Sequence, residues 1–190
     1  MYRVIPNFIT AKEQQYLKEY TNKKILEANG KLKSYSDHEQ LYNKTNIANI
    51  EPLYYFYIQD DLKTNTLLAD IVRKMQVAVG VSEENPNTYF NWVISIAPPK
   101  AEVLAHVDPI SPEVLKDKKI VRINLLVQNA ARGGRFELTE DKQGKGNWIE
   151  AKIPDMALMT FDASDIWHRI TKNMSNTTRI NLSIDAVVDR

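Results

Sequence analysis

The chain has 190 residues, of which 43% are hydrophobic and 26% are charged, and this composition is typical of one globular domain rather than of a disordered or fibrous protein. Its 25 basic residues nearly balance its 24 acidic ones, which argues against a protein that works mainly by electrostatic capture of nucleic acid or of an anionic membrane. The absence of cysteine excludes disulfides, zinc–thiolate sites and thiol nucleophiles.

Residues 1–88 are expected to be mostly helical. Thr10 and Glu13 have the spacing of a capping box, and they predict the start of a helix that ends near Gly30. A second helix is predicted over 65–80 from apolar residues at i, i+3 and i+4 spacing. The apolar stripe of the first helix consists of Leu17, Tyr20, Ile25 and Leu26.

Two further segments lie between these helices. Residues 31–50 are polar and are predicted to form a solvated loop, with a lid over a site as the alternative. Residues 54–57 read Tyr-Tyr-Phe-Tyr, and this aromatic run favours a strand.

From Tyr89 onward the hydrophobic pattern has a period of two residues. Because no helical pattern interrupts this part of the chain, we predict an antiparallel sandwich or barrel such as a jelly roll, with the N-terminal helices covering one sheet. The domain is then a single one over 1–190, with its β core at 89–187. Clusters of Pro, Gly, Asn and Asp separate eight predicted strands, which are 89–97, 101–108, 119–128, 134–139, 147–152, 156–162, 166–171 and 178–187.

Two of these strands carry rows of polar residues. In 119–128, Arg122 and Asn124 alternate with aliphatic residues, and in 178–187 a similar alternation begins at Arg179. A sheet with one face in solvent would explain both rows. A polar pocket inside a barrel would explain them too, and only the pocket gives the two arginines a ligand to bind.

A candidate metal site is formed by two of the three histidines. His106 and Asp108 are two residues apart, so a strand would place both side chains on one face, where both can reach a metal ion. His168 lies several predicted strands later, and a barrel can bring such a strand opposite the first. Two imidazoles and one carboxylate form a facial triad that leaves positions open for Fe(II) chemistry. Taken alone, a His-x-Asp pair is more often a structural feature.

Arg179 strengthens the metal hypothesis because it follows His168 by 11 residues, on the next predicted strand. A guanidinium there can hold the far carboxylate of a dicarboxylate in a bidentate fork, which a lysine does less specifically. A His-x-Asp pair, a later histidine and then an arginine is the arrangement that 2-oxoglutarate oxygenases use.

On these residues the chain resembles the Fe(II)/2-oxoglutarate-dependent dioxygenases, and within them the aspartyl/asparaginyl β-hydroxylase group, which includes free-proline hydroxylases. The likeness covers roughly 89–187 and implies a double-stranded β-helix (jelly-roll, cupin-like) core buttressed by helices. Four stretches carry it: Ser95 to His106, Val121-Arg122-Ile123-Asn124-Leu125, Gly146 to Glu150 followed by Met159 to Ser164, and Arg179 to Asp185.

The resemblance implies a role for each matching position. His106, Asp108 and His168 would be the iron ligands, and Arg179 would bind the distal carboxylate of 2-oxoglutarate. Ser95 would donate its hydroxyl to the same cosubstrate. The remaining two positions are Arg122, which would contact a carboxylate of cosubstrate or substrate, and Asn124, which stands where the family often has histidine and would make a weaker contact to the cosubstrate.

The implied function is hydroxylation of an amino acid, free or within a peptide or protein, with Fe(II), 2-oxoglutarate and O2 consumed to give succinate and CO2. The partner is then a small-molecule or peptide substrate that carries a carboxylate or amide. Residues 109–119 form a long segment that would wall the substrate site. The N-terminus lacks a signal-peptide core and no apolar run could span a bilayer, so we expect a cytoplasmic protein with no membrane partner.

Other functions fit parts of the pattern. A cupin-like metalloprotein would hold a metal without 2-oxoglutarate, but it has no need for convergent arginines. A non-catalytic barrel that binds a small molecule or a protein has no need for an intact metal triad. An oxygenase acting on nucleic acid would need more basic surface than the short cluster at 116–119.

Overall fold

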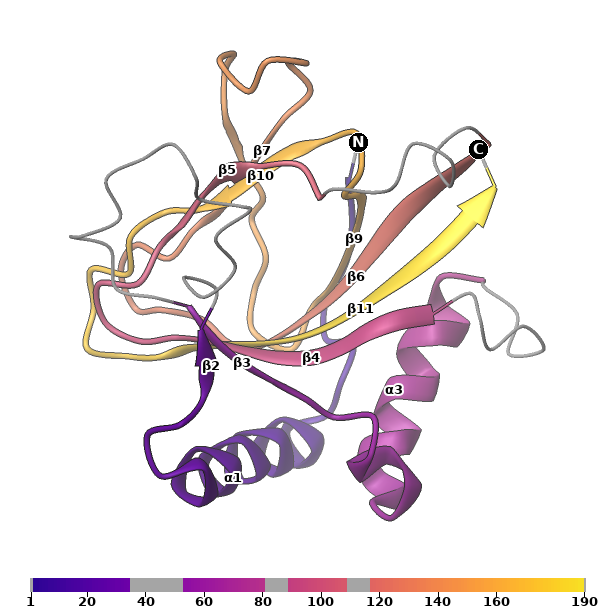
Figure 1. Cartoon of the computed structure of the whole chain (residues 1–190), viewed down its shortest axis with the longest axis vertical. Helices are drawn as coiled ribbons and strands as arrows, with labels where there is room; N and C mark the ends of the chain where they lie inside the picture. The colour runs from indigo at the N-terminus through magenta and orange to yellow at the C-terminus, as the bar shows by residue number, and fades with distance from the viewer. Residues whose placement is uncertain (1, 35–52, 81–88, 109–116, 190) are drawn as a thin grey trace.

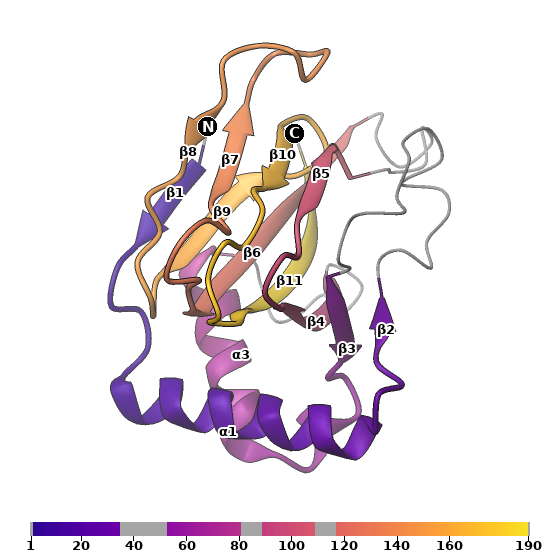
Figure 2. The same ribbon diagram turned by 90° about the vertical axis from the view of Figure 1, so that its left-hand side faces the viewer.

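The computed structural model describes residues 2–34, 53–80, 89–108 and 117–189. Within these ranges the chain forms three layers, which are two α-helices, a seven-stranded antiparallel sheet and a four-stranded antiparallel sheet (Figures 1 and 2). The helices lie against one face of the larger sheet, and the smaller sheet lies over the other face. Most of the predicted loop at 31–50 and of the predicted substrate wall at 109–119 falls outside the described residues.

The first helix, α1 (Ala11–Ala28), begins where the capping box predicted. The backbone N–H of Glu13 donates to the Thr10 hydroxyl at 3.2 Å, and the Thr10 N–H donates to the Glu13 carboxylate at 2.8 Å. Asn29 ends the helix in the left-handed conformation, one residue before the predicted Gly30. Local side-chain chemistry therefore determines both ends of α1.

The second helix, α3 (Thr66–Ala78), follows the short 3-10 turn η3 (Asp61–Lys63) and is capped by Asn65. No helix among the described residues is long and apolar enough to cross a membrane. The predicted stripe of α1 is wrong at Leu26, which is 79% exposed because it lies about 100° around the helix from the half-buried Ile25. The buried side chains of the two helices include Leu17, Tyr20, Leu68, Ile71, Val72 and Met75.

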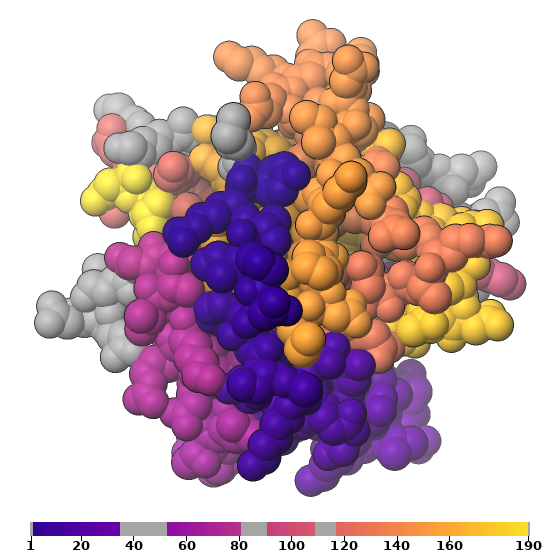
Figure 3. All heavy atoms as spheres, turned by 180° about the vertical axis from the view of Figure 1, so that it is seen from behind, coloured from indigo at the N-terminus to yellow at the C-terminus, as the bar shows by residue number. Residues whose placement is uncertain are grey.

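The N-terminal segment also supplies three strands to the larger sheet: β1 (Tyr2–Ile5), β2 (Lys33–Ser34) and β3 (Tyr54–Tyr57). Only β3 was predicted. β1 pairs with a strand far along the chain, with Tyr2 opposite Phe161, and no local pattern reveals such a partner. Figure 3 shows this indigo segment crossing the back of the molecule beside the orange part of the chain.

All eight strands predicted after residue 88 are present. Apart from β7 and β8, which pair with each other in the smaller sheet, they alternate between the two sheets. The larger sheet has the order β1-β9-β6-β11-β4-β3-β2 and the smaller sheet β5-β10-β7-β8. The strands are β4 (Tyr89–Ala97), β5 (Val103–His106), β6 (Lys118–Gln128), β7 (Phe136–Thr139), β8 (Ile149–Glu150), β9 (Leu158–Asp162), β10 (Trp167–Ile170) and β11 (Arg179–Asp189).

The two faces of β6 and β11 bury different side chains. Toward the helices, Ile123, Leu125 and Leu182 join the main apolar core and are fully buried. On the opposite face, Asn124 and Asn181 lie between the two sheets and are also buried. The polar rows therefore line the interior, and the pocket explains them where a solvent-facing sheet does not.

Candidate metal and carboxylate site

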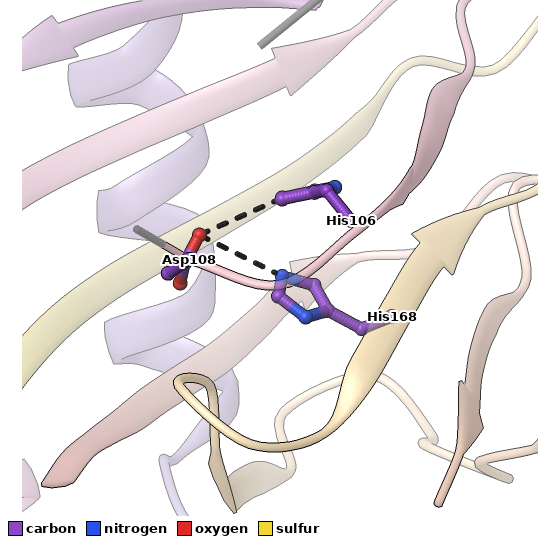
Figure 4. A group of neighbouring side chains, drawn as sticks. All are labelled: His106, Asp108 and His168. Atoms are coloured by element: carbon purple, nitrogen blue, oxygen red, sulfur yellow. Dashed lines mark ion pairs between the residues drawn. The ribbon is translucent and has the colours of Figure 1, made fainter. Parts of the chain in front are cut away.

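Three side chains converge at one edge of the smaller sheet (Figure 4). His106 is the last residue of β5, and it stands directly opposite His168 of β10 in the strand register. Asp108 follows two residues later, and its Oδ1 lies 3.6 Å from His106 Nε2 and 3.9 Å from His168 Nε2. The ligand atoms of the three side chains all lie within 4.8 Å of one another. The structure thus brings the three predicted metal ligands together.

Backbone carbonyls orient both imidazoles. His106 Nδ1 lies 2.7 Å from the Leu104 carbonyl oxygen, and His168 Nδ1 lies 3.1 Å from that of Ile166. A carbonyl can only accept, so each Nδ1 carries a proton, and the neutral form of each ring then has its lone pair on Nε2, the atom that faces Asp108. This tautomer is the one that binds a metal through Nε2.

His168 Nε2 is buried and has no hydrogen-bond partner within the described ranges. Burial lowers the pKa of His168 to about 3, so that its imidazole is neutral at physiological pH. A buried acceptor without a donor is destabilising unless something binds it. A metal ion would remove this penalty, and two imidazoles with one carboxylate suit Fe(II) in particular.

The carboxylate of Asp108 is ionised. Burial alone would raise its pKa, but the attraction of the Arg122 guanidinium outweighs burial and holds the pKa well below its usual range. Arg122 Nη2 lies 2.8 Å from Asp108 Oδ2. The guanidinium also makes two hydrogen bonds to Asp185, from Nε at 2.7 Å and from Nη2 at 2.8 Å. Arg122 therefore lies between two carboxylates of the protein itself, and its predicted contact with a carboxylate of cosubstrate or substrate stays a prediction.

Arg179 begins β11 and is 3% exposed. It lines the same cavity as the three metal-ligand candidates, and this cavity has a volume of about 280 Å³. Its buried Nε has no hydrogen-bond partner within the described ranges. Burial lowers the pKa of Arg179 to about 10, which still leaves the guanidinium charged at physiological pH. A buried guanidinium with an N–H group that lacks a hydrogen-bond partner is suited to bind an anion.

Neutral polar groups line the cavity between Arg179 and the metal-ligand candidates. Asn124 Oδ1 accepts from Ser183 Oγ at 2.8 Å and from Asn181 Nδ2 at 3.2 Å. Ser95 also lines the cavity, and its hydroxyl donates to the Asn181 carbonyl at 3.4 Å. The predicted cosubstrate contacts of Ser95 and Asn124 stay predictions.

Sequence reasoning gave no role to three residues of β11: Asn181, Ser183 and Asp185. Side chains alternate along β11, so these three lie on the same face as Arg179, and this alternation is the sequence signal by which they could have been found. Their partners come from β4 and β6, and the sequence alone does not align these strands.

No known protein-family profile matches the chain, and no curated protein matches it in sequence. Solved structures do match. A prolyl-4-hydroxylase from Pseudomonas putida is similar over 100% of this chain and 92% of its own, with a TM-score of 0.63 at 12% identity. A prolyl hydroxylase from Trichoplax adhaerens, solved with a hypoxia-inducible-factor peptide, is similar over 97% of this chain and 82% of its own, with a TM-score of 0.63 at 13% identity.

A third similar structure is SnoK, a non-haem α-ketoglutarate-dependent carbocyclase of nogalamycin biosynthesis. It matches over 98% of this chain and 79% of its own, with a TM-score of 0.65 at 9% identity. At these identities the likeness shows the fold. The chain shares its fold with these two prolyl hydroxylases and with SnoK, and the similarity extends over the N-terminal helices, which the sequence resemblance left unmatched.

Proposed function

We propose that this chain is an Fe(II)- and 2-oxoglutarate-dependent oxygenase. One observation carries the proposal: a buried arginine, Arg179, shares a cavity with the His106, Asp108 and His168 cluster. A metal-binding protein without a dicarboxylate cosubstrate has no need for that arginine. The fold shared with enzymes of this class supports the same function.

The residues that line the cavity would have different roles in this reaction. His106, Asp108 and His168 would hold Fe(II), and Arg179 would hold the far carboxylate of 2-oxoglutarate in a bidentate fork. Bound iron would supply the activation of O2, with one oxygen atom going to the substrate and the other to the succinate that forms as CO2 leaves. Cosubstrate and substrate would displace water from the cavity, and this would strengthen each charged contact inside it.

Finer features belong to the same proposal. Strands β4–β11 would form a double-stranded β-helix, or jelly roll, because all of them except the pair β7 and β8 alternate along the chain between two facing antiparallel sheets. Residues 1–190 would form a single oxygenase domain of a cytoplasmic protein. Ser95 and Asn124, which line the cavity, would contact the cosubstrate.

The substrate class that we propose is an amino acid, free or within a peptide, which the enzyme would hydroxylate. Two observations support this class. Four stretches of the sequence resemble the β-hydroxylase and free-proline hydroxylase group, and two of the structurally similar proteins are prolyl hydroxylases, one of them solved with a peptide bound.

Anaerobic spectroscopy tests the proposal before any substrate is known. Adding Fe(II) and 2-oxoglutarate to the protein should give the weak visible charge-transfer band of the iron chelate. Arg179→Ala should lose the band at cosubstrate concentrations that saturate the wild type, and His168→Ala should lose it at every concentration. Arg73→Ala is the matched control, because Arg73 is an exposed arginine of α3 that pairs with Asp70.

Each outcome of this experiment has a distinct meaning. Metal binding without a band, and without dependence on Arg179, would overturn the oxygenase proposal in favour of a cupin-like metalloprotein. No metal binding by the wild type would overturn the metal site itself and leave a non-catalytic binding barrel.

A further inference from the structure

A chain of buried contacts leads from the larger sheet to the metal-ligand candidate Asp108. Asp185 and Arg122 stand directly opposite each other on β11 and β6. Asp185 is 1% exposed, and both of its carboxylate oxygens accept from Arg122, at 2.7 and 2.8 Å. This bidentate geometry fixes the plane of the guanidinium. A rigid guanidinium can in turn fix what it contacts.

The same Nη2 that donates to Asp185 lies 2.8 Å from Asp108 Oδ2. The other oxygen of Asp108, Oδ1, is the one that faces the Nε2 atoms of His106 and His168. Arg122 thus occupies one side of the carboxylate and turns the other side toward the two imidazoles.

A bulge in β4 adds a third contact to Asp185. The register between β4 and β11 shifts between Ser183 and Asp185, which leaves two residues of β4, Asn91 and Trp92, opposite the single residue Ile184. Asn91 has a φ of 54° and donates from Nδ2 to Asp185 Oδ2 at 3.0 Å. Bulges beside active sites commonly re-aim a side chain. Here the bulge brings a neutral donor to the carboxylate that anchors Arg122.

We propose that Arg122, anchored by Asp185, is a positioning residue that holds Asp108 with Oδ1 directed at the metal. The proposal rests on the metal site of the proposed function and goes beyond the role that resemblance gave to Arg122. It assigns Asp185, to which the resemblance gave no role, to the support of the site. Partners of this kind around metal ligands typically change metal affinity by about 10- to 100-fold.

For the variant Arg122→Met, charge repulsion alone and positioning of Asp108 predict opposite changes in metal affinity. A guanidinium next to the site repels a divalent cation, so its removal in Arg122→Met should tighten metal binding if charge were its only effect. Positioning predicts weaker binding. The double variant R122M/D185L separates the two effects further, because it removes one positive and one negative charge, keeps the net charge around the site and does not leave Asp185 as an unpaired buried carboxylate.

The test measures the affinity of the protein for Co²⁺ alone, by calorimetry and by the visible absorption of the bound ion. We expect Arg122→Met, Arg122→Lys and R122M/D185L each to weaken Co²⁺ binding by about 10- to 100-fold. Lysine keeps the charge but cannot hold two carboxylates in a planar fork, so it should not restore the affinity. Adding D185L to R122M should weaken binding no further, because Asp185 acts through Arg122.

The matched control is the pair Lys118 and Asp189, which are partners on the same two strands but lie at the exposed end, with Nζ 3.1 Å from Oδ1. Lys118→Met with Asp189→Asn should leave Co²⁺ affinity unchanged. Thermal unfolding of every variant verifies that it is folded, and if Arg122→Met alone does not fold, R122M/D185L and Arg122→Lys decide the question.

The two proposals fail in different ways. If the wild type does not bind Co²⁺, the metal site of the proposed function is wrong. If the wild type binds Co²⁺ and the folded Arg122 variants bind it equally or more tightly, the metal site stands and the positioning role is overturned.

Discussion

The two faces of β6 and β11 are both largely buried and differ in their chemistry. Toward the helices the strands present mainly aliphatic side chains, among them Ile123, Leu182 and Ile184, all with 0% exposure. Toward the smaller sheet the same strands present Arg122, Asp185 and a row of amides and hydroxyls. A single pair of strands therefore contributes both to the core of the protein and to its candidate site.

The contrast has an energetic meaning. Burying the aliphatic face stabilises the fold by about 25 cal/mol per Å² of apolar surface. Burying a polar group stabilises the fold by only about 1 kcal/mol when it finds a hydrogen-bond partner, and destabilises the fold when it does not. Arg179 Nε, Asn181 Oδ1 and His168 Nε2 have none within the described ranges. We infer that the face between the two sheets lowers the stability of the fold and that its unpartnered groups serve to bind ligands. Four substitutions test this contrast between the apolar and the polar regions.

The largest effect should come from the helix-facing side. Leu182→Ala removes a fully buried side chain from the main core, and we expect it to lower the free energy of unfolding by about 2–5 kcal/mol. Co²⁺ affinity of the folded variant should not change. Urea unfolding and a metal titration on the same sample measure both quantities. A loss of less than about 1 kcal/mol would break the proposed division of the two faces.

Arg179→Met should change the free energy of unfolding in the opposite direction from Leu182→Ala. It replaces a buried cation by an apolar side chain of similar length, and we expect the ligand-free protein to become more stable by about 1–3 kcal/mol. The same variant should lose the charge-transfer band with 2-oxoglutarate. If the ligand-free protein were instead destabilised, Arg179 would have a structural role that its contacts do not show.

A carboxylate in the helical layer provides a comparison for Asp108. Asp61 accepts from Tyr20 at 2.7 Å and from Lys24 at 2.8 Å, and it links α1 to η3. Burial alone would raise its pKa, but the contacts with Lys24 and Tyr20 outweigh burial and hold the pKa below the usual 3.8. Because the pKa is lowered in the folded state, Asp61 stabilises the fold above pH 3.8, and this contribution is lost as the pH falls from there toward the folded-state pKa.

Asp61→Asn should therefore lower the unfolding free energy at neutral pH by about 1 kcal/mol, since the group is partly exposed. The difference between variant and wild type should shrink as the pH falls below 3.8. Urea unfolding as a function of pH measures it, with Asp60→Asn as the control, because Asp60 is 94% exposed. Metal affinity should be unchanged in both variants, and a change would contradict a purely structural role for Asp61.

Local patterns predicted much of this molecule. The capping box at Thr10, the apolar spacing that places the second helix near Asn65 and the period-two alternation after residue 88 act over a few residues, so the sequence reveals them directly. The convergence of His106, Asp108 and His168 followed from residue types that suit one metal. Strand register depends on contacts between distant segments, and this is why β1 and the pairing of Arg122 with Asp185 were not foreseen.

The smallest predicted effect tests the outermost contact of the site. Asn91→Gly removes the amide that donates to Asp185 but keeps a residue that tolerates a φ of 54°. We expect Co²⁺ affinity to fall by about threefold, because Arg122 still holds Asp185 through two hydrogen bonds. Asn91→Ala should weaken Co²⁺ binding equally and should also destabilise the fold by about 1 kcal/mol through its left-handed backbone. If Asn91→Gly bound Co²⁺ as tightly as the wild type, the cross-strand pair alone would anchor Asp108, and the role of the bulge would be limited to the shape of β4.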